Sequence, residues 1–554
     1  MYFNPTDEQK DIVDEFLKGN HLVVQAGAGT GKTSTIELLA KQSQKQGQQG
    51  LYFAFNKSIV DDVKKKLSGT DIQPRTFHSV ALEIAKKHPK ISVLLSKMGN
   101  KSLRPKELAE IFFVRKHFTY ISNDDFKISA GNDSVFLSSA ALCGYARNAV
   151  IKFCQSSDDK ITRIHVPSVK DMPDKQVTEF QDAVLPIARR MWADLLDPAG
   201  IQRIEHDHYL KFVSLEHVDL RKELGLNDGD VIFFDEAQDA RPCMTSMVLE
   251  QAYRNDLKDG LQIVALGDSA QAIYATFTGA RDALPEFSLL PDSVVLPLTT
   301  SWRFGESVAD VANSVLDLLD ADIRLKGNPN VNSFVHGFDY EEGPDGGAPD
   351  AVLVRTNDQM VLELLRYQSW GLKVCASSDK SSILTIVDDV ERIIQGQRPR
   401  SADMFDFKEH ADIAEFVESE FSEPTLRSLL SLILKNGVDN TRKAFDNTVT
   451  ERRADVFVST IHKSKGRQWP RVAVVADPVK CVPKTIPDTF DYVGREKLML
   501  LYVAFTRAQE ELIVPYEILE ALNNLAATGE AGFFSDSGVY FGQDFSSRRT
   551  DALF

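Results

Sequence analysis

The chain has 554 residues, of which 43% are hydrophobic and 26% charged, and its formal net charge is -16. At roughly 100–200 residues per domain, this length predicts three or four domains, each with its own core. The composition is typical of a globular protein, no apolar run reaches the ~18–20 residues of a membrane span, and the acidic balance argues against a protein that coats nucleic acid through bulk charge.

The N-terminal sequence, MYFNPTDEQK, is polar and has no signal-peptide core. We therefore expect a cytoplasmic protein with no membrane association, or a nuclear protein in a eukaryotic host. The cysteines form no CxxC pair and lie beside no histidine at zinc-ligand spacing, which predicts unpaired thiols in a reducing compartment. They are Cys143, Cys154, Cys243, Cys375 and Cys481.

Short apolar strands alternate with helical segments in the first half of the chain. HLVVQAGAGTGKT predicts a strand, a glycine loop and the start of a helix. GLYFAFNK, VIFFDEAQD and QIVALGD predict further buried strands, and the last two end in acidic residues. This order predicts an α/β parallel sheet with its chemistry at the carboxyl ends of the strands. Between about residues 99 and 206 the helical period predicts an insertion into this domain.

The second half of the chain repeats this alternation. AVLVRT and KVCAS, and later DVFVSTIH, RVAVVAD and ELIVPY, predict the strands of a second α/β domain. Between them, residues 379–453 have a helical pattern and predict a second insertion. EEGPDGGAPD, from Glu341 to Asp350, predicts a turn-rich loop. The tail from residue 531 has no periodicity, and we expect it to be mobile.

AGAGTGKT, from Ala26 to Thr33, is a glycine loop between a predicted strand and a predicted helix. Backbone N–H groups of such a loop, together with the helix N-terminus, can cradle phosphates. Lys32 would then reach the β- and γ-phosphates, and the Thr33 hydroxyl would reach Mg²⁺. The pattern is a variant of the P-loop, because Ala26 stands where that motif has glycine.

DEAQD, from Asp235 to Asp239, directly follows the apolar run VIFF. A carboxylate at a strand end next to a P-loop can hold the water shell of Mg²⁺, which suits Asp235. Glu236 is placed to orient or deprotonate an attacking water. The alternative is a solvated acidic loop.

Two further segments place aromatic side chains beside polar ones. In LGDSAQAIYATFTGA, Gln271 could sense a γ-phosphate, while Tyr274 and Phe277 could stack on unpaired bases or be core aromatics. In TTSWRFG, Trp302 could stack on adenine and Arg303 could reach phosphate. A surface cation–π pair is the alternative for the second segment.

The last two segments carry basic residues. STIHKSKGRQW contains His462 and Lys463 and is a candidate contact for a phosphate backbone, or a solvated loop. In LLYVAFTRAQEELIV, Arg507 interrupts an apolar run, where arginine is seldom buried without an anionic partner. We expect Arg507 to be an arginine finger that reaches the γ-phosphate held by the other α/β domain.

Taken in order, these segments resemble the motifs of the superfamily 1 helicases of the UvrD/Rep/PcrA type. Gln9 resembles the Q motif, AGAGTGKT motif I, FAFNKS motif Ia and RTFHSVALEIAK motif Ib. DEAQD, GDSAQAIY, TSWRFG, TIHKSKG and YVAFTRA resemble motifs II to VI. Within the superfamily the resemblance is strongest to the F-box DNA helicase branch, through HDHYLKF, WRFG and FNKSI. Since the Q motif begins within ten residues of Met1, we expect no F-box before it.

The resemblance covers about residues 1–515 and implies two RecA-like parallel-sheet domains in tandem, with ATP between them. Domain 1A would comprise residues 1–98 and 207–296, and domain 2A residues 297–378 and 454–530. Each would carry a mainly helical insertion, namely 1B (99–206) and a compact 2B (379–453). Residues 531–554 would form a flexible tail.

The resemblance also assigns site residues. Catalytic roles are implied for Lys32, Asp235, Glu236, Gln271, Arg303 and Arg507, with Mg²⁺ at Thr33 and Asp235. Nucleotide contacts are implied for Gln9, Ala26, Gly27, Ala28, Gly29, Thr30, Gly31, Lys32, Thr33, Ser34, Trp302 and Gln468. Contacts to single-stranded DNA are implied for Phe55, Asn56, Thr76, Phe77, His78, Tyr274, Phe277, His462 and Lys463. The chain departs from the family at Ser34, where an arginine often stands, and at Gln468, which replaces a glutamate.

The implied activity is that of a monomeric, ATP- and Mg²⁺-dependent helicase or translocase that moves 3′ to 5′ on single-stranded DNA. Its partners would be single strands and single-strand/duplex junctions, with single-strand-binding or recombination proteins as further candidates. Two alternatives stay open: a translocase that strips bound proteins, and a module that uses ATP only to switch partner binding. The sequence does not choose between recombination control, repair, phage replication and defence.

Overall fold

The computed structural model describes residues 5–54, 57–99, 103, 105–112, 114, 117–121, 134–169, 172–252, 260–339, 348–401, 404, 407–418, 424–477, 481–488 and 491–528. The chain divides into two compact units. The first comprises Met1–Gln25, Thr33–Gly267 and Tyr274–Leu296, and the second Ala26–Lys32, Asp268–Ile273 and Pro297–Phe554. The glycine loop and the GDSAQ segment thus belong to the second unit.

The first unit is built on a six-stranded sheet with the order β3-β2-β6-β7-β1-β8. The registered pairs β1–β7, β2–β3, β2–β6 and β6–β7 are parallel. β2 and β6 are buried along their whole length, as the continuous apolar runs predict for strands covered on both faces. The strands are β1 (His21–Ala26), β2 (Gly50–Ala54), β3 (Ile72–Thr76), β6 (Val231–Phe234), β7 (Gln262–Gly267) and β8 (Ser293–Leu298).

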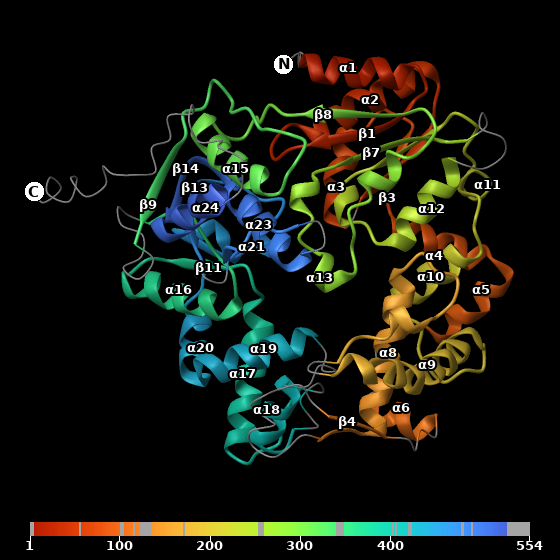
Figure 1. Ribbon diagram of the computed structural model, residues 1–554, viewed down its shortest axis with the longest axis vertical. Helices are drawn as coiled ribbons and strands as arrows, with labels where there is room; N and C mark the ends of the chain where they lie inside the picture. The colour runs from red at the N-terminus through yellow and green to blue at the C-terminus, as the bar shows by residue number, and fades with distance from the viewer. Residues whose placement is uncertain are drawn as a thin grey trace, which may run out of the picture. The chain divides into compact units, whose positions relative to one another are not determined.

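Helices follow the strands of this first sheet and also form the insertion. The helices of the sheet domain are α1 (Asp7–Leu17), α2 (Lys32–Gln46), α3 (Lys57–Lys66), α4 (Phe77–Lys87), α5 (Pro89–Leu94), α12 (Pro242–Ala252), α13 (Ala275–Thr278) and α14 (Leu284–Phe287). The insertion and its return contribute α6 (Pro105–Ile111), α8 (Ser139–Gln155), α9 (Asp174–Leu196), α10 (His206–Leu215) and α11 (Leu220–Leu224). Figure 1 shows α6, α8 and α9 gathered around β4.

The insertion is not entirely helical. It contains an antiparallel pair, β4 (Phe118–Ile121) and β5 (Ser134–Leu137), which the sequence analysis missed. The two strands have only four residues each, too few for their alternation to stand out in the sequence.

The second unit also has a six-stranded sheet, with the order β11-β12-β10-β13-β14-β9, and all of its registered pairs are parallel. The predicted fold class, two RecA-like parallel-sheet domains in tandem, is confirmed. The strands are β9 (Phe334–Phe338), β10 (Ala351–Val354), β11 (Val374–Ala376), β12 (Val456–Thr460), β13 (Trp469–Val475) and β14 (Ala508–Pro515). The helices are α15 (Glu306–Leu318), α16 (Asn357–Ser369), α17 (Lys380–Ile394), α18 (His410–Glu418), α19 (Pro424–Asn436), α20 (Val438–Asp446), α21 (Ile461–Ser464), α23 (Tyr492–Phe505) and α24 (Tyr516–Thr528).

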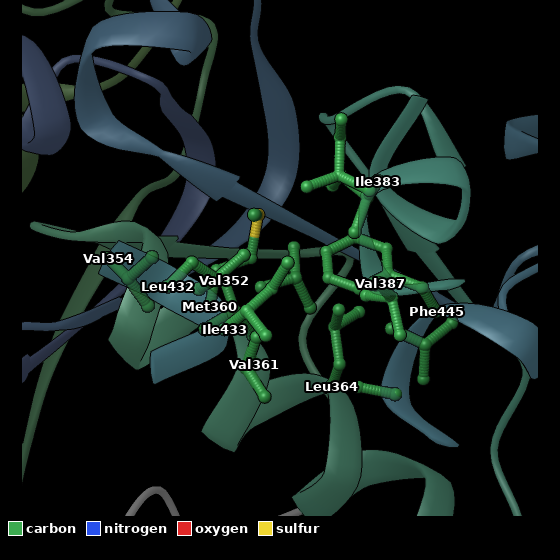
Figure 2. Close-up of a cluster of buried hydrophobic side chains, with 14 of the residues drawn as sticks. Val352, Val354, Met360, Val361, Leu364, Ile383, Val387, Leu432, Ile433 and Phe445 are labelled. Atoms are coloured by element: carbon green, nitrogen blue, oxygen red, sulfur yellow. The ribbon is translucent and has the colours of Figure 1, made fainter. Parts of the chain in front are cut away.

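The helices between residues 380 and 446 share one hydrophobic core with this sheet. Figure 2 shows side chains of β10 and α16 meeting those of α17, α19 and α20. The labelled members are Val352, Val354, Met360, Val361, Leu364, Ile383, Val387, Leu432, Ile433 and Phe445. This segment therefore covers the sheet and takes part in the core of the second domain.

Two edge strands were not predicted from the sequence. β3 and β9 each lie at the end of a sheet order, and both mix buried and exposed residues. β3 contains Pro74, which suits an edge strand because proline cannot donate to a ladder. An edge strand is buried less completely than a central one, so its sequence is less apolar and gives a weaker signal.

Other predictions concern chemistry and the chain ends. All five cysteines are buried and unpaired, as predicted. No helix in the described ranges has the length and apolarity needed to cross a bilayer. The tail 531–554 and residues 341–347 of the turn-rich loop lie outside the described residues.

We expect Phe445→Ala to destabilise the second domain. Phe445 is fully buried in the core shared by α16, α17 and β10, and removing a buried phenylalanine side chain costs about 3–5 kcal/mol. The measurement is the urea midpoint of unfolding, with Leu362→Ala as control because Leu362 on α16 is 58% exposed. Equal midpoints for the two variants would show that these helices do not share the core.

Candidate nucleotide-binding site

The glycine loop leads from β1 into α2. Gly29 and Gly31 have φ of 76° and 90°, the left-handed region that favours glycine. A Cβ added at Gly29 would lie 2.7 Å from Ser301 Oγ and 2.8 Å from Arg303 Cβ. Thr30 closes the turn by donating its hydroxyl to Gly27 O at 2.9 Å. The loop is therefore a backbone cradle that the TTSWRFG segment approaches closely.

TTSWRFG is tied to this loop through the main chain. Trp302 N donates to Gly29 O at 2.8 Å, and Gly27 N donates to Leu298 O at 3.0 Å. The Trp302 ring is 45% exposed, so it is free to stack on a flat ligand. Ser34 of α2 is exposed as well.

Gln9 is buried, with 1% of its surface exposed. Its Oε1 accepts from Thr6 N at 3.1 Å, and its Nε2 donates to Thr35 Oγ1 at 3.0 Å. The side chain thus fixes the start of α1 to α2. An adenine contact of Gln9 stays a prediction, and it would have to use the second amide hydrogen or replace one of these bonds.

The DEAQD segment begins where β6 ends. Asp235 is 6% exposed and accepts from Tyr52 Oη at 2.5 Å and from Glu236 N at 3.0 Å. Burial, with the Asp235 carboxylate beside it, raises the pKa of Tyr52, so the hydroxyl stays protonated and donates. This bond holds one carboxylate oxygen of Asp235 in place.

Glu236 has a left-handed backbone, with φ of 54°. A non-glycine residue in this region stores strain of the order of 1–3 kcal/mol and persists only where its surroundings hold it. Gln238 Nε2 donates to Glu236 Oε2. The strained turn directs the Glu236 side chain away from the course that a continuing strand would take.

The GDSAQ segment carries a fully buried carboxylate, Asp268. Its Oδ2 accepts from Gln271 Nε2 at 2.6 Å and from Tyr502 Oη at 3.1 Å. Tyr502 Oη in turn accepts from Ala28 N of the glycine loop at 3.1 Å. Burial is the largest of the effects that raise the pKa of Tyr502 well above its usual value, so this hydroxyl stays neutral and fills both roles.

Arg507 completes this hydrogen-bonded chain. Its Nη2 donates to Gln271 Oε1 at 3.3 Å, although the guanidinium is only 1% exposed. Nε donates to Val503 O at 2.8 Å, and Nη1 donates to Arg467 O at 3.2 Å. The continuous path therefore runs from Ala28 through Tyr502, Asp268 and Gln271 to Arg507. Figure 1 places α23, the helix that ends just before Arg507, beside α21 of the same unit.

Arg303 lies in the same group of contacts. Its Nε donates to Gln468 Oε1 at 2.7 Å, and its Nη1 donates to Thr506 O at 2.6 Å. The structure thus brings together Gln271, Arg303, Gln468 and Arg507 from four predicted motifs. Lys465, which the sequence analysis did not select, donates to Gln271 O at 2.6 Å.

Some site residues were missed by the sequence analysis. Tyr502 had no separate signal, because it lies in an apolar run and was interpreted only as part of a buried segment. Asp268 ends the predicted strand QIVALGD, and an acid at a strand end was the available signal. Tyr52 lies inside an apolar strand, where its hydroxyl gave no indication of a partner 183 residues away.

A metal ion would find few protein ligands here. Within the described part of the chain, no group of three or more His, Cys, Asp or Glu side chains could hold one. Mg²⁺ commonly binds through one or two protein groups together with phosphates and waters. Mg²⁺ at Asp235 and Thr33, carried by a nucleotide, stays a prediction.

Comparison with protein families matches residues 9–277 to the AAA domain and residues 455–514 to the UvrD-like helicase C-terminal domain. Three curated proteins are similar. F-box DNA helicase protein 1 of Schizosaccharomyces pombe is 26% identical over 92% of this chain and 57% of its own length. F-box DNA helicase 1 of Gallus gallus is 24% identical over 95% of this chain and 50% of its own length. DNA helicase IV of Escherichia coli is 25% identical over 57% of this chain and 48% of its own length.

The chain is similar to DNA helicases and, over residues 455–514, to the UvrD-like helicase C-terminal domain. It spans about half the length of the curated relatives it matches. The first match lies on the first unit, except for residues 26–32 and 268–273, which belong to the second unit. The second match lies on the second unit.

The residues predicted to contact DNA lie in different surroundings. Thr76 is the N-cap of α4 and accepts from Ser79 N at 3.1 Å. Phe77 is 4% exposed and lies against Phe53 and Phe234, with ring centroids 4.1 Å and 5.1 Å away. Phe77 also lines a small cavity with His78 and Glu236, and its contact with DNA stays a prediction. Its neighbour His78 is partly exposed.

The remaining predicted DNA contacts are distributed as follows. Tyr274, partly exposed, is the N-cap of α13. Lys463 is exposed and donates to Ser378 Oγ at 2.8 Å, and His462 Nε2 lies 3.9 Å from Glu496 Oε1. Phe55, Asn56 and the Phe277 side chain lie outside the described residues, although the Phe277 backbone belongs to α13.

We expect Tyr502→Phe to weaken ATP binding about tenfold or more. The change removes the hydroxyl that links Ala28 N to Asp268, and leaving buried polar groups without a partner costs about 1–3 kcal/mol. Titration with a fluorescent ATP analogue measures the affinity. The control is Tyr492→Phe, on the same helix, because Tyr492 is 74% exposed. An unchanged affinity for Tyr502→Phe would mean that this chain of bonds does not support the loop.

Proposed function

We propose that this chain is an ATP-dependent DNA helicase or translocase that moves 3′ to 5′ on single-stranded DNA. The observation that carries the proposal is the hydrogen-bonded path from the glycine loop through Tyr502, Asp268 and Gln271 to the buried Arg507. A glycine turn with a purely structural role gains nothing from a desolvated arginine at the other end of such a path. In a loop that binds phosphate, the arginine can interact with the negative charge of the bound phosphate.

The residues of the site fit ATP with Mg²⁺. The positive-φ glycines leave room for phosphate oxygens against the backbone N–H groups, and Lys32 begins the helix that follows. In our proposal Lys32 and the loop hold the phosphates, Thr33 and Asp235 hold Mg²⁺, and the exposed Trp302 ring covers the base. ATP supplies the phosphoanhydride bond, and Mg²⁺ neutralises the charge of its phosphates.

Glu236 is the proposed general base. Its carboxylate is partly exposed, whereas Asp235 is buried and bonded to Tyr52. Two neighbouring carboxylates in different environments suit two roles, one as a metal ligand and one that accepts a proton from water. Gln238, bonded to Glu236, would orient that carboxylate.

Arg507, Arg303 and Gln271 are the proposed sensors of the γ-phosphate. Donors of both arginines reach oxygens of Gln271, Gln468 and the backbone. A buried cation such as Arg507 stabilises an added negative charge strongly, because the site has a low effective dielectric constant. Loss of that charge on hydrolysis would release the two arginines and so drive the step along the strand.

The proposed nucleic-acid partners are single strands and single-strand/duplex junctions. The described candidates for contacts to the strand are Thr76, Phe77, His78, Tyr274, His462 and Lys463. With a net charge of -16, the chain should bind through a few local contacts, which predicts a modest dependence of affinity on salt. Monomeric action, and displacement of single-strand-binding or recombination proteins, belong to the same proposal.

We expect ATP hydrolysis to be stimulated by single-stranded DNA and to be lost in Lys32→Ala, because that lysine would hold the transferred phosphate. Steady-state ATPase rates with and without oligonucleotide measure this. Forked substrates with a 3′ or a 5′ tail then test polarity, and a protein-displacement assay separates unwinding from stripping. Hydrolysis that DNA does not stimulate would instead favour a module that uses ATP as a switch for partner binding.

We expect Glu236→Gln to lower the ATPase rate by about 10²–10⁴-fold while ATP still binds, because only proton transfer is removed. Single-turnover hydrolysis and analogue binding give the two quantities. Glu286→Gln, an exposed carboxylate of the same unit, serves as control. A parallel loss of affinity in Glu236→Gln would assign the residue to binding instead of hydrolysis.

A further inference from the structure

The helix α10, with the sequence HDHYLKFVSL, has no role in the proposed nucleotide site. It packs against α4, α8 and α12 of the same unit (Figure 1). α4 carries His78, α8 belongs to the insertion, and α12 follows the DEAQD turn. α10 therefore contacts the predicted DNA-contact segment, the insertion and the element that follows the catalytic carboxylates.

One side of α10 is anchored to the insertion by Lys211. This lysine is fully buried, and its Nζ donates to Ser156 O at 2.8 Å and to Asp158 O at 2.6 Å. The ammonium also lies 4.5 Å from the centre of the Phe153 ring. These contacts satisfy the cation at the end of α8, so α10 and α8 form a rigid support.

The first turn of α10 carries Asp207, which faces two cationic or potentially cationic side chains. Its Oδ1 accepts from Arg241 Nη1 at 2.5 Å and lies 3.8 Å from His78 Nε2. The three side chains are 29%, 17% and 31% exposed, so solvent screens their interactions less than at an open surface. Asp207 is therefore hydrogen-bonded to Arg241, and His78, whose pKa is lowered mainly by burial, lies beside the same carboxylate.

Arg241 links this carboxylate to the turn that bears Glu236. It follows Asp239 by two residues, and its carbonyl accepts from Met244 N at 2.8 Å and Thr245 N at 3.1 Å at the start of α12. Arg241 therefore joins Asp207 to the segment between the Glu236 turn and the start of α12.

His78 approaches the same turn from another direction. Its side chain lines a small cavity together with Asp235, Glu236 and Asp239. In the described part of the chain, Arg241 Nε is buried without a hydrogen-bond partner. Arg241 Nη1 nevertheless bonds Asp207, and His78 lies beside the same carboxylate.

We propose that Asp207 is a positioning residue that couples contact of a single strand at His78 to the carboxylate turn. Without a strand, His78 lies beside the carboxylate that pairs with Arg241. When a strand engages His78, Asp207 keeps its bond to Arg241 alone, and this pair holds the turn that carries Glu236. This inference rests on the proposed function, and it specifies how nucleic acid would raise the hydrolysis rate.

The test uses Asp207→Asn in the full chain, which keeps the shape of the side chain and removes its charge. We expect the ATPase rate without DNA, and the affinities for a fluorescent ATP analogue and a labelled oligo-dT, to stay within about threefold of wild type. We expect stimulation by oligo-dT to fall at least tenfold. Asp182→Asn is the matched control, since Asp182 pairs with Arg163 in the same unit at 2.7 Å but both side chains are about half exposed.

A second variant, Arg241→Gln, removes the same pair from the other side and serves if Asp207→Asn does not fold. The double variant should lose no more stimulation than either single variant, because both changes break one interaction. Full stimulation in Asp207→Asn overturns the proposal. A tenfold loss of oligo-dT affinity also overturns it, because Asp207 would then be a DNA-binding residue. A lowered melting temperature together with loss of the basal ATPase rate overturns it as well, because Asp207 would then have a structural role. If wild type shows no stimulation by DNA, the proposed function itself fails.

Discussion

The burial of the Arg507 guanidinium is the constraint on which the second unit depends. A desolvated cation is strongly destabilising unless its donors are satisfied, and these donors reach Val503 and Arg467 backbone carbonyls, the Thr506 hydroxyl and the Gln271 amide. Gln271 is 236 residues away in the sequence. Burying one side chain therefore holds together segments that the chain order separates widely.

The neutral hydroxyl of Tyr502 extends this constraint to the glycine loop. Because burial keeps it protonated, it accepts from a loop amide and donates to Asp268 at the same time. The carboxylate turn of the first unit is held by the Tyr52 hydroxyl on Asp235, by Gln238 on Glu236 and by backbone bonds such as the one from Ala283 N to Ala237 O. Within this turn Glu236 has a strained, left-handed backbone.

Much of the fold could be predicted from local sequence. The central strands β1, β2, β6 and β7, and their counterparts in the second sheet, are continuous apolar runs, because both of their faces are covered. Motif spacing then located Lys32 at the start of α2, and Asp235 and Glu236 directly after β6. The edge strands β3 and β9 were not predicted, because their partial exposure leaves no clear periodicity. The pair β4–β5 was not predicted because both strands are short.

The sequence by itself determined the fold class, the glycine loop and the residue types of the site. Only the tertiary structure decided which of them meet. It paired Tyr502 with Ala28 and Asp268, buried Phe77 under Phe53 and Phe234, and merged the helices of residues 380–446 with the core of the second sheet. The reason is physical: periodicity reports the face that a residue presents, whereas its partner is fixed by the packing of elements far apart in the chain.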